Sequence, residues 1–125
     1  MWITGASSGI GAALAHEFAK RGAVVCISAR RKERLVEVAR SIRIQGGQAS
    51  LYPCDVTQDQ ELSTVIESIV ADHGKLDCAV ANAGFAVGGR IETLNAEDWR
   101  LQFEVNVVAT AMTAKYALGE LRRSK

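Results

Sequence analysis

Three glycines and two serines near the start of the chain form a loop that could bind a phosphate group. Gly5, Gly9 and Gly11 are spaced four and two residues apart in the run T-G-A-S-S-G-I-G. An apolar segment precedes this run and an amphipathic helical pattern follows it, which predicts a turn from a strand into a helix. We expect Gly5 to form a tight turn, Gly9 to let an anion approach the main chain, and Gly11 to let the helix pack against the strand. The amides and positive dipole end of the helix, with the hydroxyls of Ser7 and Ser8, would then bind the anion.

The end of the second apolar segment carries cations at a position where dinucleotide-binding folds often carry an acid. An Asp or Glu there binds the ribose 2′-hydroxyl of NAD. Here the sequence reads Ser28, Ala29, Arg30, Arg31, Lys32, with no carboxylate. Guanidinium is a permanently charged, bidentate partner for phosphate, so we expect Arg30, assisted by Arg31 or Lys32, to bind a 2′-phosphate. NADP(H) is therefore the expected cofactor and NAD(H) the alternative; a solvated basic helix start is the other explanation for these cations.

Alternating strand and helix patterns must position these residues. Continuous apolar runs predict strands that are covered on both faces. The expected strands lie at 1–3, 23–29, 49–53 and 76–81. Four strands that alternate with helices predict an α/β fold, with a Rossmann-type, doubly wound parallel sheet in the order 3-2-1-4.

The helices between and after these strands show apolar positions at helical spacing. The first is expected to bury Ile10, Leu14 and Phe18, and the second to cover 31–45. A third, capped by Thr57 or Asp59 and ended by Gly74, has a stripe that consists of Leu62, Val65, Ile66, Ile69 and Val70. A fourth begins at 96 after an Asn95 cap. A last helix is expected over 106–122, with Asn106 at the break between the two.

Three more segments resemble, together with the glycine loop, the short-chain dehydrogenase/reductase family. They are the D-V pair at Asp55 and Val56, the N-A-G element at Asn82, Ala83 and Gly84, and the asparagine of E-V-N-V, Asn106. The resemblance covers essentially the whole chain. It implies an NAD(P)-dependent oxidoreductase that interconverts an alcohol and a carbonyl group, acting on a small-molecule substrate as a homo-oligomer.

The resemblance also implies a role for each matching residue. Asp55 would accept a hydrogen bond from the adenine amino group, Asn82 would bond neighbouring strand ends, and small Ala83 and Gly84 would leave room for the nicotinamide ribose. Asn106 would be the catalytic asparagine that holds a water for proton relay; stabilising a kink is its alternative role. The expected cofactor-binding residues are Gly5, Ser7, Ser8, Gly9, Ile10, Gly11, Arg30, Arg31, Asp55, Val56, Asn82, Ala83 and Gly84.

The family's acid/base pair has no match in this chain. That pair is Y-x-x-x-K, in which the tyrosine is the general acid/base. Val56 stands four residues after Tyr52, and Glu120 four residues after Tyr116; we expect Tyr116 to be a packing residue. The sequence is therefore interpreted as a single cofactor-binding domain, residues 1–125, cut before the catalytic serine and tyrosine. A non-catalytic dinucleotide-binding module or sensor is the alternative. A P-loop is disfavoured because no G-K-[ST] follows the glycines.

Composition limits the other classes of function. The 125 residues suffice for one domain, and the net charge of +1 argues against nucleic acid as a partner. No apolar run approaches the length of a membrane span, and no signal-peptide pattern precedes the first strand. Cys26, Cys54 and Cys78 lack metal-ligand spacing. We expect buried free thiols, no metal and a cytoplasmic protein.

Overall fold

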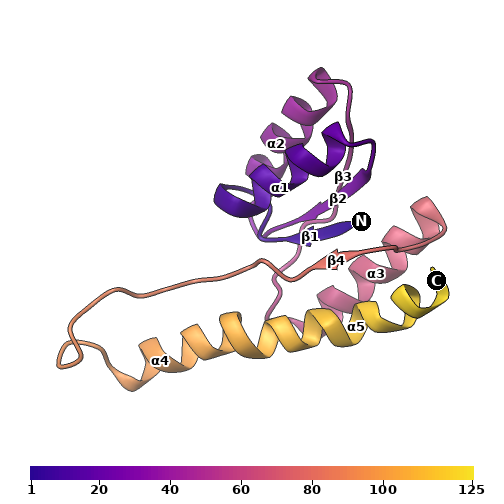
Figure 1. Ribbon diagram of the computed structural model, residues 1–125. Helices are drawn as coiled ribbons and strands as arrows, with labels where there is room; N and C mark the ends of the chain where they lie inside the picture. Colours follow the sequence, from indigo (N-terminus) through magenta and orange to yellow (C-terminus); the bar gives the residue numbers. More distant parts are fainter.

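The computed structural model describes residues 1–125 and contains a parallel sheet with helices on both faces (Figure 1). The strands are β1 (Trp2–Thr4), β2 (Val24–Ser28), β3 (Gln48–Leu51) and β4 (Ala79–Val80). The helices are α1 (Gly9–Lys20), α2 (Lys32–Ile44), α3 (Asp59–His73), α4 (Ala96–Phe103), the π-helical segment η1 (Glu104–Val108) and α5 (Ala109–Arg123). The sheet order is β3-β2-β1-β4, and every pair is parallel. The predicted α/β class and strand order are confirmed.

Alternating side chains of each strand face two separate cores. Trp2 and Cys26 lie on the face covered by α3 and α5, whereas Ile3 and Ile27 lie on the face covered by α1 and α2. Figure 1 shows the same three layers. The indole Nε1 of Trp2 donates a buried hydrogen bond of 2.8 Å to Ser28 Oγ, which joins β1 to β2 on the face covered by α3 and α5. Two buried faces explain why these strands read as continuous apolar runs.

Helix α1 buries small residues fully, and of the three large residues predicted to be buried, Leu14 and Phe18 pack against the core while partly exposed. Its buried residues are Gly11, Ala15 and Ala19, while Ile10 is 74% exposed. The prediction that Ile10 belongs to a buried stripe is therefore wrong. A face of small side chains lets the helix backbone lie close to the sheet, and Leu14 and Phe18 pack beside that face.

Several predicted details differ in the structure. The strand expected over 76–81 is shorter in the structure, where β4 is only the pair Ala79–Val80; Leu76 is buried before it and Cys78 is exposed. The expected burial of Cys78 is thus wrong; Cys26 and Cys54 are buried as predicted. Neither Thr57 nor Asp59 caps α3, whose N-cap residue is Gln58 without a side-chain cap. The Thr57 hydroxyl instead donates to Asp55 Oδ1.

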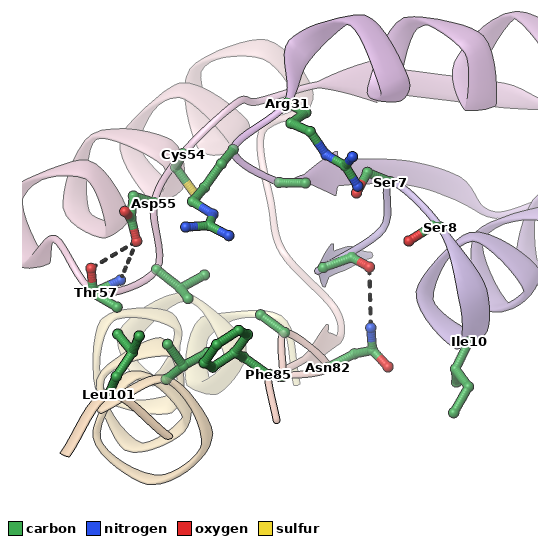
Figure 2. A pocket seen from close by; sticks show the side chains of 17 residues that line it. Ser7, Ser8, Ile10, Arg31, Cys54, Asp55, Thr57, Asn82, Phe85 and Leu101 are labelled. Carbon is green, nitrogen blue, oxygen red and sulfur yellow. Dashed lines mark hydrogen bonds between the residues drawn. The ribbon is translucent and has the colours of Figure 1, made fainter. Parts of the chain in front are cut away.

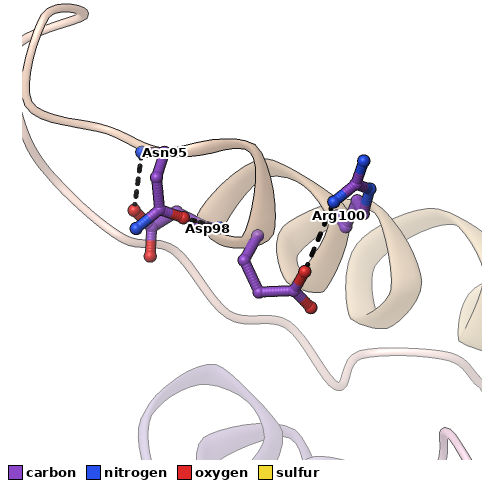
Figure 3. Close-up of polar contacts among 4 residues, drawn as sticks. Asn95, Asp98 and Arg100 are labelled. Carbon is purple, nitrogen blue, oxygen red and sulfur yellow. Dashed lines mark hydrogen bonds and ion pairs between the residues drawn. The ribbon is translucent and has the colours of Figure 1, made fainter.

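Helix α4 begins at the predicted cap. Asn95 Oδ1 accepts from the Asp98 amide, and Asp98 Oδ2 accepts from the Asn95 amide, each at 3.0 Å (Figure 3). This reciprocal capping box satisfies two backbone donors. No break separates α4 from α5, so the predicted inter-helix break at Asn106 is wrong. Asn106 lies in η1, a π-helical turn that continues one helix into the next.

No helix in the structure is both long enough and apolar enough to span a lipid bilayer.

Candidate functional site

One cleft of about 470 Å³ opens at the carboxyl ends of the strands, where ligands bind in open parallel sheets. Seventeen residues line it, drawn in Figure 2. They include eleven of the thirteen predicted cofactor-binding residues: Gly5, Ser7, Ser8, Ile10, Arg30, Arg31, Asp55, Val56, Asn82, Ala83 and Gly84. Gly9 and Gly11 are not among the lining residues. Segments that are far apart in the sequence are therefore brought to one site.

The glycine loop takes the predicted conformation. Gly5 and Gly9 have φ of 65° and 55°, in the left-handed region that favours glycine. A Cβ on Gly9 would meet no atom within 4 Å, so the backbone there is open to a ligand. Ser8 is the N-cap of α1, but its hydroxyl makes no capping bond. The first amides of α1 and this hydroxyl remain free to donate to an anion.

Gly11 allows a closer contact than the one predicted. A Cβ at this position would lie 2.6 Å from Asn82 Nδ2 and would also collide with the Gly5 carbonyl oxygen. Gly11 therefore lets α1 pack against the loop after β1 and against Asn82, not against the strand itself. Any larger residue would separate the two loops that form the cleft floor.

Thr4 and Asn82 connect those loops. Thr4 Oγ1 accepts from the amides of Asn82 and Ala83 at 3.0 and 3.1 Å. Asn82 Nδ2 lies within hydrogen-bond distance of two carbonyl oxygens, those of Thr4 at 3.1 Å and Gly5 at 3.3 Å. Figure 2 draws one of these contacts as a dashed line. The predicted bonding of Asn82 to a neighbouring strand end is confirmed. The role of Thr4 was not predicted. The feature that could have indicated it is a threonine at the end of a buried strand, directly before the first glycine of the loop.

Asp55 is held in the cleft with one oxygen occupied. Its Oδ1 accepts from the amide and hydroxyl of Thr57 at 3.0 and 2.7 Å. Its Oδ2 has no hydrogen-bond partner in the structure and appears without a dashed line in Figure 2. One carboxylate oxygen is thus available to an N–H donor of a ligand.

The cations lie at the same cleft. Arg30 and Arg31 both line it and are exposed, and neither forms an ion pair with a side chain of this chain. Asp55 is the only carboxylate among the lining residues. The cleft therefore offers two unpaired guanidinium groups together with free amides and hydroxyls, which is a donor set for a polyanion.

Six lining residues were not predicted. They are Ala29, Cys54, Thr57, Phe85, Leu101 and Val105. Leu101 and Val105 are four residues apart on the helix that runs from α4 into η1, so they share a face. They could not be found from the sequence because nothing local shows that this helix lies over the cleft. Phe85, Leu101 and Val105 give one wall of the cleft an apolar surface. Phe85 and Leu101 are seen at the lower side of Figure 2.

The cleft has few groups for proton transfer. Its titratable side chains are Arg30, Arg31, Asp55 and Cys54. Burial raises the pKa of the Cys54 thiol to about 11, so it stays protonated and is a poor nucleophile at neutral pH. Asn106 lies at the edge of the site, where its side chain bonds the backbone of Phe85. No group of three or more His, Cys, Asp or Glu residues is arranged to hold a metal ion.

Comparisons with known proteins give a consistent family. The sequence profile of the short chain dehydrogenases matches residues 1–125. The chain is similar to 11-beta-hydroxysteroid dehydrogenase A of Arachis hypogaea, with 38% identity over 125 residues, 98% of this chain and 36% of that protein. The chain thus spans less than half the length of this curated relative.

Solved structures are similar in fold as well as in sequence. A metagenomic short-chain oxidoreductase in complex with NADP has a TM-score of 0.90 and 32% identity, with 98% of this chain and 56% of that chain covered. An alcohol dehydrogenase from the archaeon Thermococcus sibiricus, complexed with 5-hydroxy-NADP, has a TM-score of 0.91 and 31% identity, with 98% and 53% covered.

Proposed function

The chain belongs to the short-chain dehydrogenase family, and we propose that it is the NADP(H)-binding part of an oxidoreductase that interconverts an alcohol and a carbonyl group. The observation that carries the proposal is the pair of unpaired arginines at the cleft. Arg30 and Arg31 stand where an acidic residue would select NAD, and a 2′-phosphate would satisfy both charges. NADP in the complexes of two similar structures supports this cofactor.

The remaining cleft residues suit the other parts of the dinucleotide. The α1 amides, the open backbone at Gly9 and the Ser8 hydroxyl fit a pyrophosphate. Asp55 Oδ2 fits the amino group of adenine. Ala83 and Gly84 leave space beside the nicotinamide ribose. The nicotinamide ring, when bound, gives or takes the hydride.

Proton transfer requires groups other than those in the cleft. Asn106 is proposed to hold a water for proton relay, and the serine and the Y-x-x-x-K pair are expected downstream of this chain. The scarcity of acid/base groups in the cleft also favours the second candidate, a non-catalytic dinucleotide-binding module. Sequencing the gene beyond Lys125 distinguishes them: a downstream serine and Y-x-x-x-K support the enzyme, and an in-frame stop supports the module.

Cofactor preference is the direct test. Dissociation constants for NADPH and NADH are measured by fluorescence titration for the wild type, Arg30→Ala and Arg31→Ala. A charge-assisted contact contributes about 1.5–3 kcal/mol, so losing Arg30 should weaken NADPH binding by roughly 10- to 150-fold and leave NADH binding unchanged. Arg34→Ala is the matched control, because Arg34 is an exposed arginine of the helix that follows, α2, pairs with Glu37 and does not line the cleft. Equal wild-type affinities for the two cofactors, or an NADPH preference that survives Arg30→Ala, would contradict the proposal.

A further inference from the structure

The backbone amide of Asp55 is bonded by a side chain that lies outside the cleft. Glu61 Oε2 accepts from the Asp55 N–H at 2.7 Å. Glu61 is exposed on the first turn of α3 and is not among the residues that line the cleft. This contact between residues six apart ties the loop between β3 and α3 to the first turn of α3.

Together with other contacts, this bond leaves only one polar group of Asp55 without a hydrogen-bond partner. The Asp55 carbonyl oxygen accepts from the Gln58 amide at 3.0 Å, and Oδ1 accepts twice from Thr57. Glu61 holds the remaining backbone group, the N–H. Only Oδ2 is left for a ligand.

The carboxylates of Asp55 and Glu61 lie close together and repel each other, so other interactions must offset this repulsion. A hydrogen bond from a neutral amide to a carboxylate is charge-assisted, and the N-terminus of α3 favours negative charge nearby. In this arrangement the Glu61 carboxylate bonds the backbone N–H of Asp55, while the Asp55 carboxylate stays available in the cleft. An ionised carboxylate accepts hydrogen bonds only, so it attracts an amino group and repels a carbonyl oxygen at the same place.

We propose that Glu61 is a positioning residue for base recognition: through the Asp55 amide it orients the Asp55 carboxylate so that the site prefers a base with an exocyclic amino group to one with a carbonyl. This inference rests on the proposed function, because it takes Asp55 as the residue that contacts the adenine ring.

The test compares two cofactors whose bases differ in that group and in the proton that the carbonyl form carries on the neighbouring ring nitrogen N1. NADPH carries adenine, and its reduced hypoxanthine counterpart carries a carbonyl in place of the amino group. Dissociation constants for both are measured by titration with the wild type, Glu61→Ala and Glu61→Gln. Glu61→Ala should weaken NADPH binding by roughly three- to tenfold, the effect of one hydrogen bond, and change binding of the hypoxanthine cofactor by less than about twofold. Glu61→Gln keeps an acceptor oxygen and should retain the wild-type preference.

Glu67→Ala is the control, because Glu67 is an exposed glutamate of the same helix that bonds only Ser63. If Glu61→Ala does not fold, Glu61→Asp takes its place, since it keeps the charge but is one methylene shorter. An equal loss for both cofactors would mean a general structural role and would overturn the inference, as would an unchanged preference. A wild-type chain that binds NADPH while Glu61 has no effect overturns this inference alone; a folded wild type that binds no NADPH overturns the proposed function as well.

Discussion

The side-chain amide of Asn106 forms two hydrogen bonds to the backbone of Phe85. Nδ2 donates to the Phe85 carbonyl oxygen at 2.7 Å, and Oδ1 accepts from the Phe85 N–H at 2.8 Å. The π-helical turn η1 thereby holds the segment that leaves β4 and passes the cleft. The same residue is the proposed catalytic asparagine. Its side chain therefore has a structural partner, and its backbone carbonyl oxygen already accepts from the Thr110 hydroxyl at 2.9 Å.

Asn106→Ala should release this segment. Two exposed hydrogen bonds together contribute about 1 kcal/mol, so the free energy of unfolding should fall by that amount while most of the fold stays intact. Hydrogen exchange at the Phe85 amide should accelerate more than at amides of β2. Val107→Ala is the control, since Val107 lies in the same turn, is 53% exposed and makes no polar contact with the segment. Unchanged exchange at Phe85 would show that other contacts hold it.

Alanine at two positions of the glycine loop should have different effects. At Gly11 the added Cβ meets backbone and Asn82, so Gly11→Ala should destabilise the fold by about 1–3 kcal/mol and speed exchange at the Asn82 and Ala83 amides without any ligand. At Gly9 the Cβ faces open space, and only the φ of 55° costs about 1–2 kcal/mol. Gly9→Ala should keep the Asn82 contacts and lose NADPH affinity. Normal NADPH binding by Gly9→Ala would place the phosphates elsewhere.

Much of the fold could be predicted because its signals are local. A continuous apolar strand reports burial on both faces, and the stripe from Leu62 to Ile69 reports which face of α3 is buried, which the structure confirms. The burial of α1 could not be read in the same way. Large residues are usually the buried ones. In α1 the fully buried residues are small, Leu14 and Phe18 are only partly buried, and Ile10 is exposed at the cleft.

The residues of the site likewise fall into those that could be predicted from the sequence and those that could not. Residues that come within a few positions after a strand, such as Asp55 and Asn82, could be predicted because parallel strands end at a common edge. Leu101 and Glu61 could not. The first depends on where a distant helix crosses the cleft, and the second on a six-residue contact that no period of a helix or strand implies.

Folding stability should fall as the pH rises from 9 to 11. Burial raises the pKa of both Cys26 and Cys54 from an ordinary 9.0 to about 11. The folded state therefore keeps these protons while the unfolded state loses them, so the stabilisation is complete below pH 9 and is lost on the way to pH 11. Urea midpoints measured at pH 7, 9, 10 and 11 give the slope. Cys54→Ala should flatten it, whereas Cys78→Ala, at an exposed cysteine, should not. A wild-type midpoint that is constant across this range would contradict the prediction.

The purified 125-residue chain should bind NADPH without reducing carbonyl compounds. The cleft contains no tyrosine, histidine or lysine, and general acid/base catalysis typically contributes about 10²–10⁴-fold to the rate. Tyr116 is the only tyrosine near the proposed Asn106 in the sequence, but it does not line the cleft, and its hydroxyl lies 3.3 Å from Asp59 Oδ2. Partial burial and the Asp59 carboxylate raise the pKa of Tyr116, the opposite of what an acid/base group needs near neutral pH. NADPH oxidation is followed with a panel of ketones, aldehydes and quinones, with boiled protein as the blank, and Tyr116→Phe should match the wild type. Turnover that requires folded protein and disappears in Tyr116→Phe would identify a proton donor within this chain and contradict the prediction.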